Sequence, residues 1–96
     1  MTHNPMPTPV DKLLKKHPNL VQSDMLKVES HVQREQGEWL INTLTITGQS
    51  VPFVYKRRRR YKSLQGQRVN ITYYPAVDTV AGIEFEVMKV VRIRVA

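Results

Sequence analysis

Cysteine is absent from this chain of 96 residues. Its absence excludes disulfide bonds, thiolate nucleophiles and cysteine-ligated zinc, and it fits a reducing compartment. Apolar runs are short: none approaches the length that spans a bilayer, and the N-terminus lacks the apolar segment of a secretory signal. We therefore expect a cytoplasmic protein with no membrane-spanning segment.

Catalytic and metal-binding motifs are lacking too. The histidines, His3, His17 and His31, have no cysteine or carboxylate partner at the spacing of metal ligands. Glu84 and Glu86 share one face of an expected strand, but with arginines close by they are better explained as a solvated, ion-paired face than as a catalytic pair. No glycine-rich phosphate loop or nucleophile motif is present. The sequence predicts a protein that is not an enzyme and holds no cofactor or metal.

Acidic residues are scarce in the second half of the chain. Fifteen Lys and Arg stand against eight Asp and Glu, which gives a net charge of +7. Residues 1–48 contain five cations and five anions, whereas residues 49–96 contain ten cations and three anions, so the whole excess lies in the second half. A charge confined to one half indicates a basic surface, which would suit nucleic acid, an anionic membrane face or an acidic protein.

Prolines crowd the first twenty residues, at Pro5, Pro7, Pro9 and Pro18. Each one removes an amide donor and favours extended backbone in the residue before it. We expect residues 1–22 to be a flexible tail with room for one short helix before Pro18, and residues 23–96 to be the folded domain.

Apolar and polar residues alternate over five segments of this domain, which predicts five strands. In the first strand Val28 and Val32 are expected to face the core and His31 the solvent. Pro75 is expected to end the fourth strand, because proline cannot donate to a ladder, and residues 76–82 to form a loop. The last strand breaks its alternation near the middle, which predicts a bend, a bulge or burial on both faces there. The expected ranges are 24–34, 39–47, 51–55, 68–74 and 83–95.

Short strands, glycine turns and no convincing internal helix indicate an all-β protein, a small five-stranded antiparallel barrel. Three strands, a connector and two more strands resemble the order of an OB-fold, whose helix normally lies at the position of residues 57–65. An SH3-like barrel has nearly the same strand count and is the alternative. The connector is predicted to be either this helix or a basic ribbon, in which the third strand extends and pairs with residues 68–74. The ribbon is favoured, because a helix would bury only Tyr61 and Leu64.

The connector carries the strongest signal in the sequence, a run from Lys56 to Lys62 in which Tyr61 alone is uncharged. Neighbouring like charges repel by about 1 kcal/mol per pair even in water, so such a run needs ample solvent or an anionic partner. Arginine binds phosphate oxygens in pairs and stacks on bases, and a tyrosine between cations offers a stacking surface. The run therefore indicates a polyanionic ligand.

These observations predict a non-catalytic module that binds nucleic acid, with single-stranded DNA or RNA favoured and with weak sequence preference. The basic run would contact phosphates, and three later arginines would extend the positive surface. Two tyrosines would stack on bases, with Trp39 as a third candidate. The predicted site consists of Lys56, Arg57, Arg58, Arg59, Arg60, Tyr61, Lys62, Arg68, Tyr74, Arg92 and Arg94.

The alternative is a protein-interaction barrel that docks on an acidic partner within a larger assembly. An apolar excess around Trp39, Ile41, Met88 and Val90 supports it, because such an excess suits a docking patch or a dimer interface. Binding to a membrane surface is not expected, since the basic run has no adjacent lipid anchor or amphipathic helix.

Overall fold

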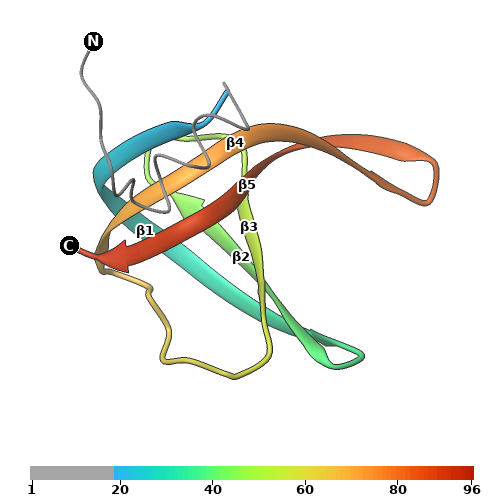
Figure 1. Ribbon diagram of the computed structural model, residues 1–96, viewed down its shortest axis with the longest axis horizontal. Helices are drawn as coiled ribbons and strands as arrows, with labels where there is room; N and C mark the ends of the chain where they lie inside the picture. Colours follow the sequence, from blue (N-terminus) through green and yellow to red (C-terminus); the bar gives the residue numbers. More distant parts are fainter. Residues whose placement is uncertain (1–18) are drawn as a thin grey trace, which may run out of the picture.

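Five β-strands make up the part of the chain that the computed structural model describes, residues 19–96 (Figure 1). All five belong to one sheet, so the predicted all-β class is confirmed. In these residues no helix is long and apolar enough to cross a membrane. Most of the predicted tail, including its short helix, lies outside the described residues. Leu20, near the C-terminal end of that tail, is buried. The strands are β1 (Val21–Gln36), β2 (Trp39–Ile46), β3 (Phe53–Arg57), β4 (Arg68–Val80) and β5 (Ile83–Val95).

The strand pairings close on themselves. β1 pairs antiparallel with both β2 and β4, β2 pairs antiparallel with β3, and β4 pairs antiparallel with β5. β3 and β5 complete the ring; they run parallel and are joined through two residue pairs, Phe53 with Met88 and Val54 with Lys89. The order around the ring is β1-β2-β3-β5-β4. The parallel pairing departs from the predicted antiparallel sheet, because the chain crosses the end of the sheet before β4 begins.

That crossing segment, residues 58–67, is called the connector here, and it forms neither a helix nor a strand. Both predicted forms are therefore wrong. A ribbon with β4 cannot form, because residues 68–73 of β4 already lie between β1 and β5 and pair with both. The connector instead follows β1, where the Gly66 N–H donates to the Val28 carbonyl (2.8 Å) and the Val28 N–H donates to the Gln67 carbonyl (2.9 Å). These contacts with β1 satisfy backbone groups that a helix would satisfy internally.

The core lies inside the ring. Phe53 is fully buried and contacts Tyr73 edge-on, with ring centroids 4.7 Å apart. Such a pair adds about 0.5–1.5 kcal/mol beyond the area that it buries. The alternation along β2 and the first half of β4 places the apolar side chains inside, as predicted. The core consists of Val28, Leu44, Ile46, Phe53, Val69, Ile71 and Tyr73.

A β-bulge in β1 reverses which side chains face the core. The register with β2 shifts between Val28 and Ser30, so Glu29 is an extra residue on the β1 side. Beyond it Val32 is 58 % exposed, while His31 turns inward and contacts Asn42. The prediction that Val32 faces the core and His31 the solvent is wrong, because a bulge shifts the two-residue period by one position.

Pro75 does not end β4, and residues 76–80 continue the strand instead of forming part of a loop. The pairing of β4 with β1 ends at Tyr73, so Pro75 pairs with β5 alone. Opposite Pro75, the Met88 N–H points away from β4 and donates to the Pro52 carbonyl (2.8 Å). The pair is thus a non-hydrogen-bonded one in the β4–β5 ladder, and the missing proline N–H costs no hydrogen bond.

Residues 76–87 form a two-stranded arm in which β4 and β5 pair only with each other. Ala81 and Gly82 join the two strands in a turn, both with positive φ (52° and 80°), as two-residue hairpin turns of this kind require. Figure 1 shows the arm projecting beyond the other strands. Nearer the C-terminus, the β4–β5 register skips Val91, so the bulge predicted in the last strand is confirmed.

Candidate functional site

A groove of about 790 Å³ lies between the outer face of β2–β3 and the arm with its base. Its floor consists of side chains that alternate with the buried ones: Ile41 and Thr43 from β2, and Val54 and Lys56 from β3. Arg34 enters from β1, where it pairs directly with Ile41. The opposite wall comes from β4 and β5 and includes Tyr74, Asp78, Val80 and Lys89.

Positive charge in the groove is only partly compensated. Lys89 forms an ion pair with Asp78, with its Nζ 2.8 Å from Oδ1. No other carboxylate belongs to the described lining. Arg34 and Lys56 form no ion pair within residues 19–96. Two cations of the groove therefore lack a counter-charge among the described residues.

Trp39 stands at the end of this surface, beside the turn between β1 and β2. It lies on the outer face of β2 with Ile41, two residues further on, and is 39 % exposed. The guanidinium carbon of Arg58 lies 4.9 Å from the Trp39 ring centre, which is cation–π distance. A ring that accepts a planar guanidinium in this way also has the chemistry to stack on a nucleobase.

Two connector arginines lie along the β1–β2 hairpin. Arg58 Nη2 is 3.9 Å from Glu38 Oε2, and Arg60 Nη2 is 3.8 Å from Glu35 Oε1. All four side chains are largely exposed, so each ion pair contributes no more than about 1 kcal/mol and is easily exchanged for another anion.

Side chains of β1 fix the backbone of the connector. Gln33 Nε2 donates to the Tyr61 carbonyl (2.9 Å), and the Leu64 N–H donates to His31 Nδ1 (2.9 Å). The other ring nitrogen of His31, Nε2, donates to Asn42 Oδ1 (2.7 Å). Because Nδ1 accepts while Nε2 donates, these two bonds fit the neutral tautomer that carries its proton on Nε2. The basic run is thereby held in one place relative to β1 and β2.

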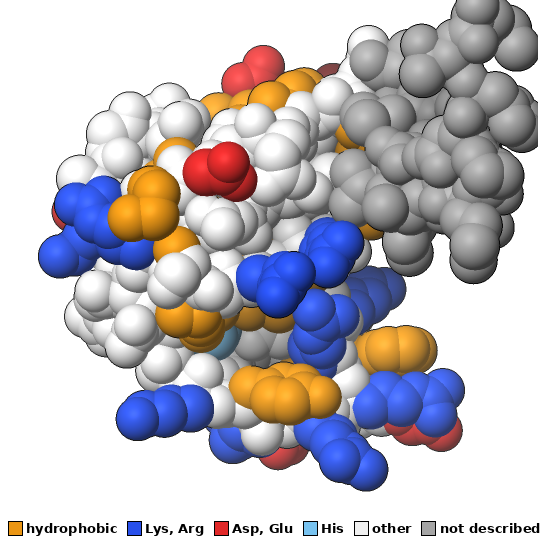
Figure 2. Space-filling model, turned by 60° about the vertical axis from the view of Figure 1, so that its left-hand side comes forward, with side chains coloured by type: hydrophobic (Ala, Val, Ile, Leu, Met, Phe, Trp, Pro, Cys, Tyr) orange, Lys and Arg blue, Asp and Glu red, His pale blue; other side chains and the backbone are white. Residues whose placement is uncertain are grey.

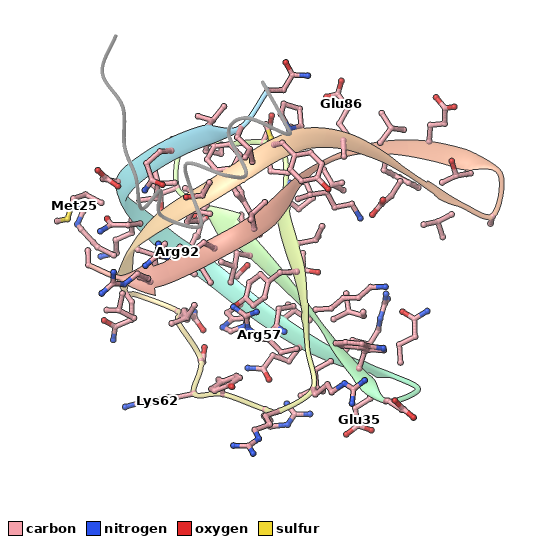
Figure 3. The ribbon with its side chains drawn as sticks, in the orientation of Figure 1. Met25, Glu35, Arg57, Lys62, Glu86 and Arg92 are labelled. Atoms are coloured by element: carbon pink, nitrogen blue, oxygen red, sulfur yellow. The ribbon has the colours of Figure 1, made fainter. Side chains whose placement is uncertain are left out.

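A second cavity, of about 400 Å³, opens where the connector passes the end of the sheet and is called the mouth cavity here. Arg57, Lys62 and Arg94 line it, and none of its described lining residues is acidic. The Arg57 guanidinium carbon lies 5.2 Å from the centre of the Tyr55 ring. Burial raises the pKa of the Tyr55 phenol above its ordinary value, and the charge of Arg57 partly opposes this rise. In Figure 3 Arg57 lies within the opening that the connector frames.

The structure divides the predicted site residues between these surfaces. Alternation in β3 sends Lys56 outward, in register with Ile41, and Arg57 inward, in register with the buried Leu40. The continuous basic run is therefore split at its first two residues. Lys56 and Tyr74 line the groove, Arg57, Tyr61, Lys62 and Arg94 line the mouth cavity, and Arg58 and Arg60 contact the β1–β2 hairpin.

The remaining predicted arginines lie elsewhere. Arg92 lines a shallow hollow that it shares with Arg94, and Arg68 donates from Nη1 to the Met25 carbonyl (3.0 Å). Arg59 forms no hydrogen bond or ion pair with any residue of the described chain. Figure 2 shows Lys and Arg side chains gathered over the lower half of one face, with few Asp or Glu among them.

No protein-family model, curated protein or solved structure matches the chain. Its function is therefore argued from its own geometry. Within residues 19–96 no three His, Asp or Glu side chains are placed to hold a metal ion.

Arg34, His31 and Tyr55 are missing from the predicted site, which included Trp39 only as a third stacking candidate. Regular alternation would place Arg34 on the core face with Val32, so its outward position depends on the bulge at Glu29. His31 carried no usable signal, because the bulge that turns it inward has no mark in the sequence.

Proposed function

We propose that residues 19–96 form an OB-type fold that binds single-stranded nucleic acid in the groove between β2–β3 and the arm. The strand order, which returns from β4 to β1 and pairs β3 with β5, supports this fold over the SH3-like alternative. In OB-folds the face of strands 2 and 3, together with the loops between strands 1 and 2 and between strands 4 and 5, binds oligonucleotides. The groove occupies the corresponding place.

One observation carries the proposal: the groove combines two cations that form no ion pair within residues 19–96, Arg34 and Lys56, with aromatic rings on the same side of the molecule. Phosphates would bind these cations and bases would stack on Trp39 and Tyr74, a combination typical of single-strand grooves. Phosphate contacts carry no sequence information, so sequence preference is weak.

The experiment is a fluorescence-anisotropy titration of labelled single-stranded and duplex oligonucleotides at several salt concentrations. Contacts of Arg34, Lys56 and Arg58 with about three phosphates give a slope of log K against log[salt] of about −2 for a single strand. The single strand is expected to bind more tightly than the duplex of the same sequence. Affinity that does not change with salt, or a clear preference for duplex, would contradict the proposal.

A second candidate function is a protein-interaction module for an acidic partner, and the arm favours it. Val77, Val80, Ile83 and Phe85 are 49–60 % exposed there, whereas Met88 and Val90, which the sequence placed in a docking patch, pack against the core. This function predicts no retention on immobilised nucleic acid at about 0.15 M salt, where screening is already strong. It also predicts the capture of one acidic protein in a fixed stoichiometry, lost when Phe85→Ser is introduced.

A further inference from the structure

The mouth cavity and the groove lie mostly on opposite sides of β3, and Tyr55 is the one described residue that lines both. Lys56 faces the groove, and its neighbour Arg57 faces the cavity together with Arg94 from the end of β5. Lys62 completes the cationic lining from the connector, and no described carboxylate lines the cavity. None of these three cations forms an ion pair within residues 19–96.

The polar groups at the bottom of this cavity already have partners. His31 uses both ring nitrogens, one toward Asn42 and the other toward the Leu64 N–H. Asn42 also donates from Nδ2 to the Leu40 carbonyl (3.2 Å). The Tyr55 hydroxyl, in contrast, forms no hydrogen bond with any described residue. A phenol is protonated at neutral pH, so this hydroxyl can donate a hydrogen bond, and burial raises its pKa further above the ordinary value of 10.0.

We infer that the mouth cavity binds the phosphate group of a single nucleotide, through Arg57, Arg94 and the Tyr55 hydroxyl. Each of these three residues presents a hydrogen-bond donor that has no partner among residues 19–96, and arginine binds two phosphate oxygens at once. The volume of about 400 Å³ lies within the range of about 300–1,000 Å³ that is usual for small-ligand sites. Leu64, Ile93 and Val95 give the apolar wall that a base or sugar would contact.

Two sources can supply such a phosphate: a free mononucleotide or the terminal phosphate of a strand. The inference does not rest on the proposed function of the groove, because neither Arg57 nor Arg94 lines the groove, and Tyr55 alone belongs to both linings. Variants at Arg34 or Lys56 test the groove alone, and variants at Arg57 or Arg94 test the cavity alone.

The test is isothermal titration calorimetry with adenosine 5′-monophosphate, adenosine and inorganic phosphate. Adenosine monophosphate is expected to bind and adenosine is not, because adenosine lacks the anion. Arg57→Gln and Arg94→Gln should each weaken binding by about tenfold or more, the usual effect of losing a charged hydrogen bond. Lys27→Gln removes the same charge from an exposed position outside both linings and should leave binding unchanged. Tyr55→Phe should weaken binding severalfold, and it keeps the inference testable if Arg57→Gln fails to fold.

The source is decided by comparing oligonucleotides with and without a 5′-phosphate. If the end phosphate tightens binding in the native protein and this gain disappears in Arg57→Gln, the ligand is the end of a strand. If the end phosphate has no effect but the mononucleotide binds, the ligand is a free nucleotide. Absence of binding by both phosphorylated probes overturns the inference. Equal weakening by Lys27→Gln and Arg57→Gln also overturns it, because the effect would then be one of net charge.

Discussion

Replacing His31 with alanine should destabilise the domain far more than replacing its neighbour Val32. His31→Ala removes the acceptor of the Leu64 N–H and the donor to Asn42, which is 4 % exposed. Two lost hydrogen bonds cost about 1 kcal/mol each, and the buried Asn42 oxygen left without a donor costs about 1–3 kcal/mol more. The expected loss is therefore about 3–5 kcal/mol, a large part of the total of about 5–10 kcal/mol for a domain of this size.

Urea denaturation provides the assay, with the midpoint expected to fall by more than about 1 M for His31→Ala and the slope m unchanged. Val32→Ala, at a side chain that is 58 % exposed, should stay within about 0.5 kcal/mol of the native protein. Faster hydrogen exchange of the Leu64 amide in His31→Ala would locate the loss at the connector. Regular alternation along β1 predicts the opposite order, with Val32 in the core. A larger loss for Val32→Ala would therefore refute the bulge and the connector contact together.

Three further predictions concern the groove and Tyr55. Trp39→Ala should weaken single-strand binding by about 1–3 kcal/mol in the anisotropy titration, whereas Trp39→Phe should retain most of the affinity. Equal losses of affinity in the two variants would rule out stacking on Trp39. Lys56→Gln should lower the salt slope by about 0.7, whereas Lys27→Gln should leave it unchanged. The pKa of Tyr55 is higher in the folded state than in the unfolded state, so the phenol of the unfolded chain ionises first as the pH rises. The free energy of unfolding therefore falls as the pH rises above 10.0 and through the raised pKa. In urea titrations at alkaline pH Tyr55→Phe should show a smaller fall than the native protein, and an identical fall would contradict the burial of the phenol.

The parts of the fold that could be predicted from the sequence are those where a strand keeps a regular period. In β2, Leu40, Leu44 and Ile46 are buried as their alternation requires, and in β4 Val69 and Ile71 follow the same rule. The second half of β1 could not be predicted, because Glu29 adds one residue without any local cue. Proline disfavours a strand, but Pro75 lies where β4 has no neighbouring strand on its second side. Its missing N–H therefore costs the strand no hydrogen bond.

The candidate site was predictable in composition but not in arrangement. The run of cations is visible in the sequence, and so is its place between two strands. The face that each cation occupies depends on the register of β3 against β2, which separates Lys56 from Arg57. The conformation of the connector depends on partners far away in the chain, His31 and Gln33, whose side chains bind its backbone. Neither the register of β3 nor the long-range partners of the connector leave a recognisable pattern in the local sequence.

The short parallel pairing of β3 with β5 determines how rigid the groove can be. Its two residue pairs, Phe53 with Met88 and Val54 with Lys89, bring together segments that are distant in the sequence, so chain entropy opposes this contact more than it opposes the pairing of consecutive strands. β3 supplies part of the groove floor, and β5 supplies part of the opposite wall. Local opening of the sheet at this pairing would therefore widen the groove before any other part of the ring separated. A ligand that contacts both walls favours the closed ring, and ring closure in turn favours the ligand.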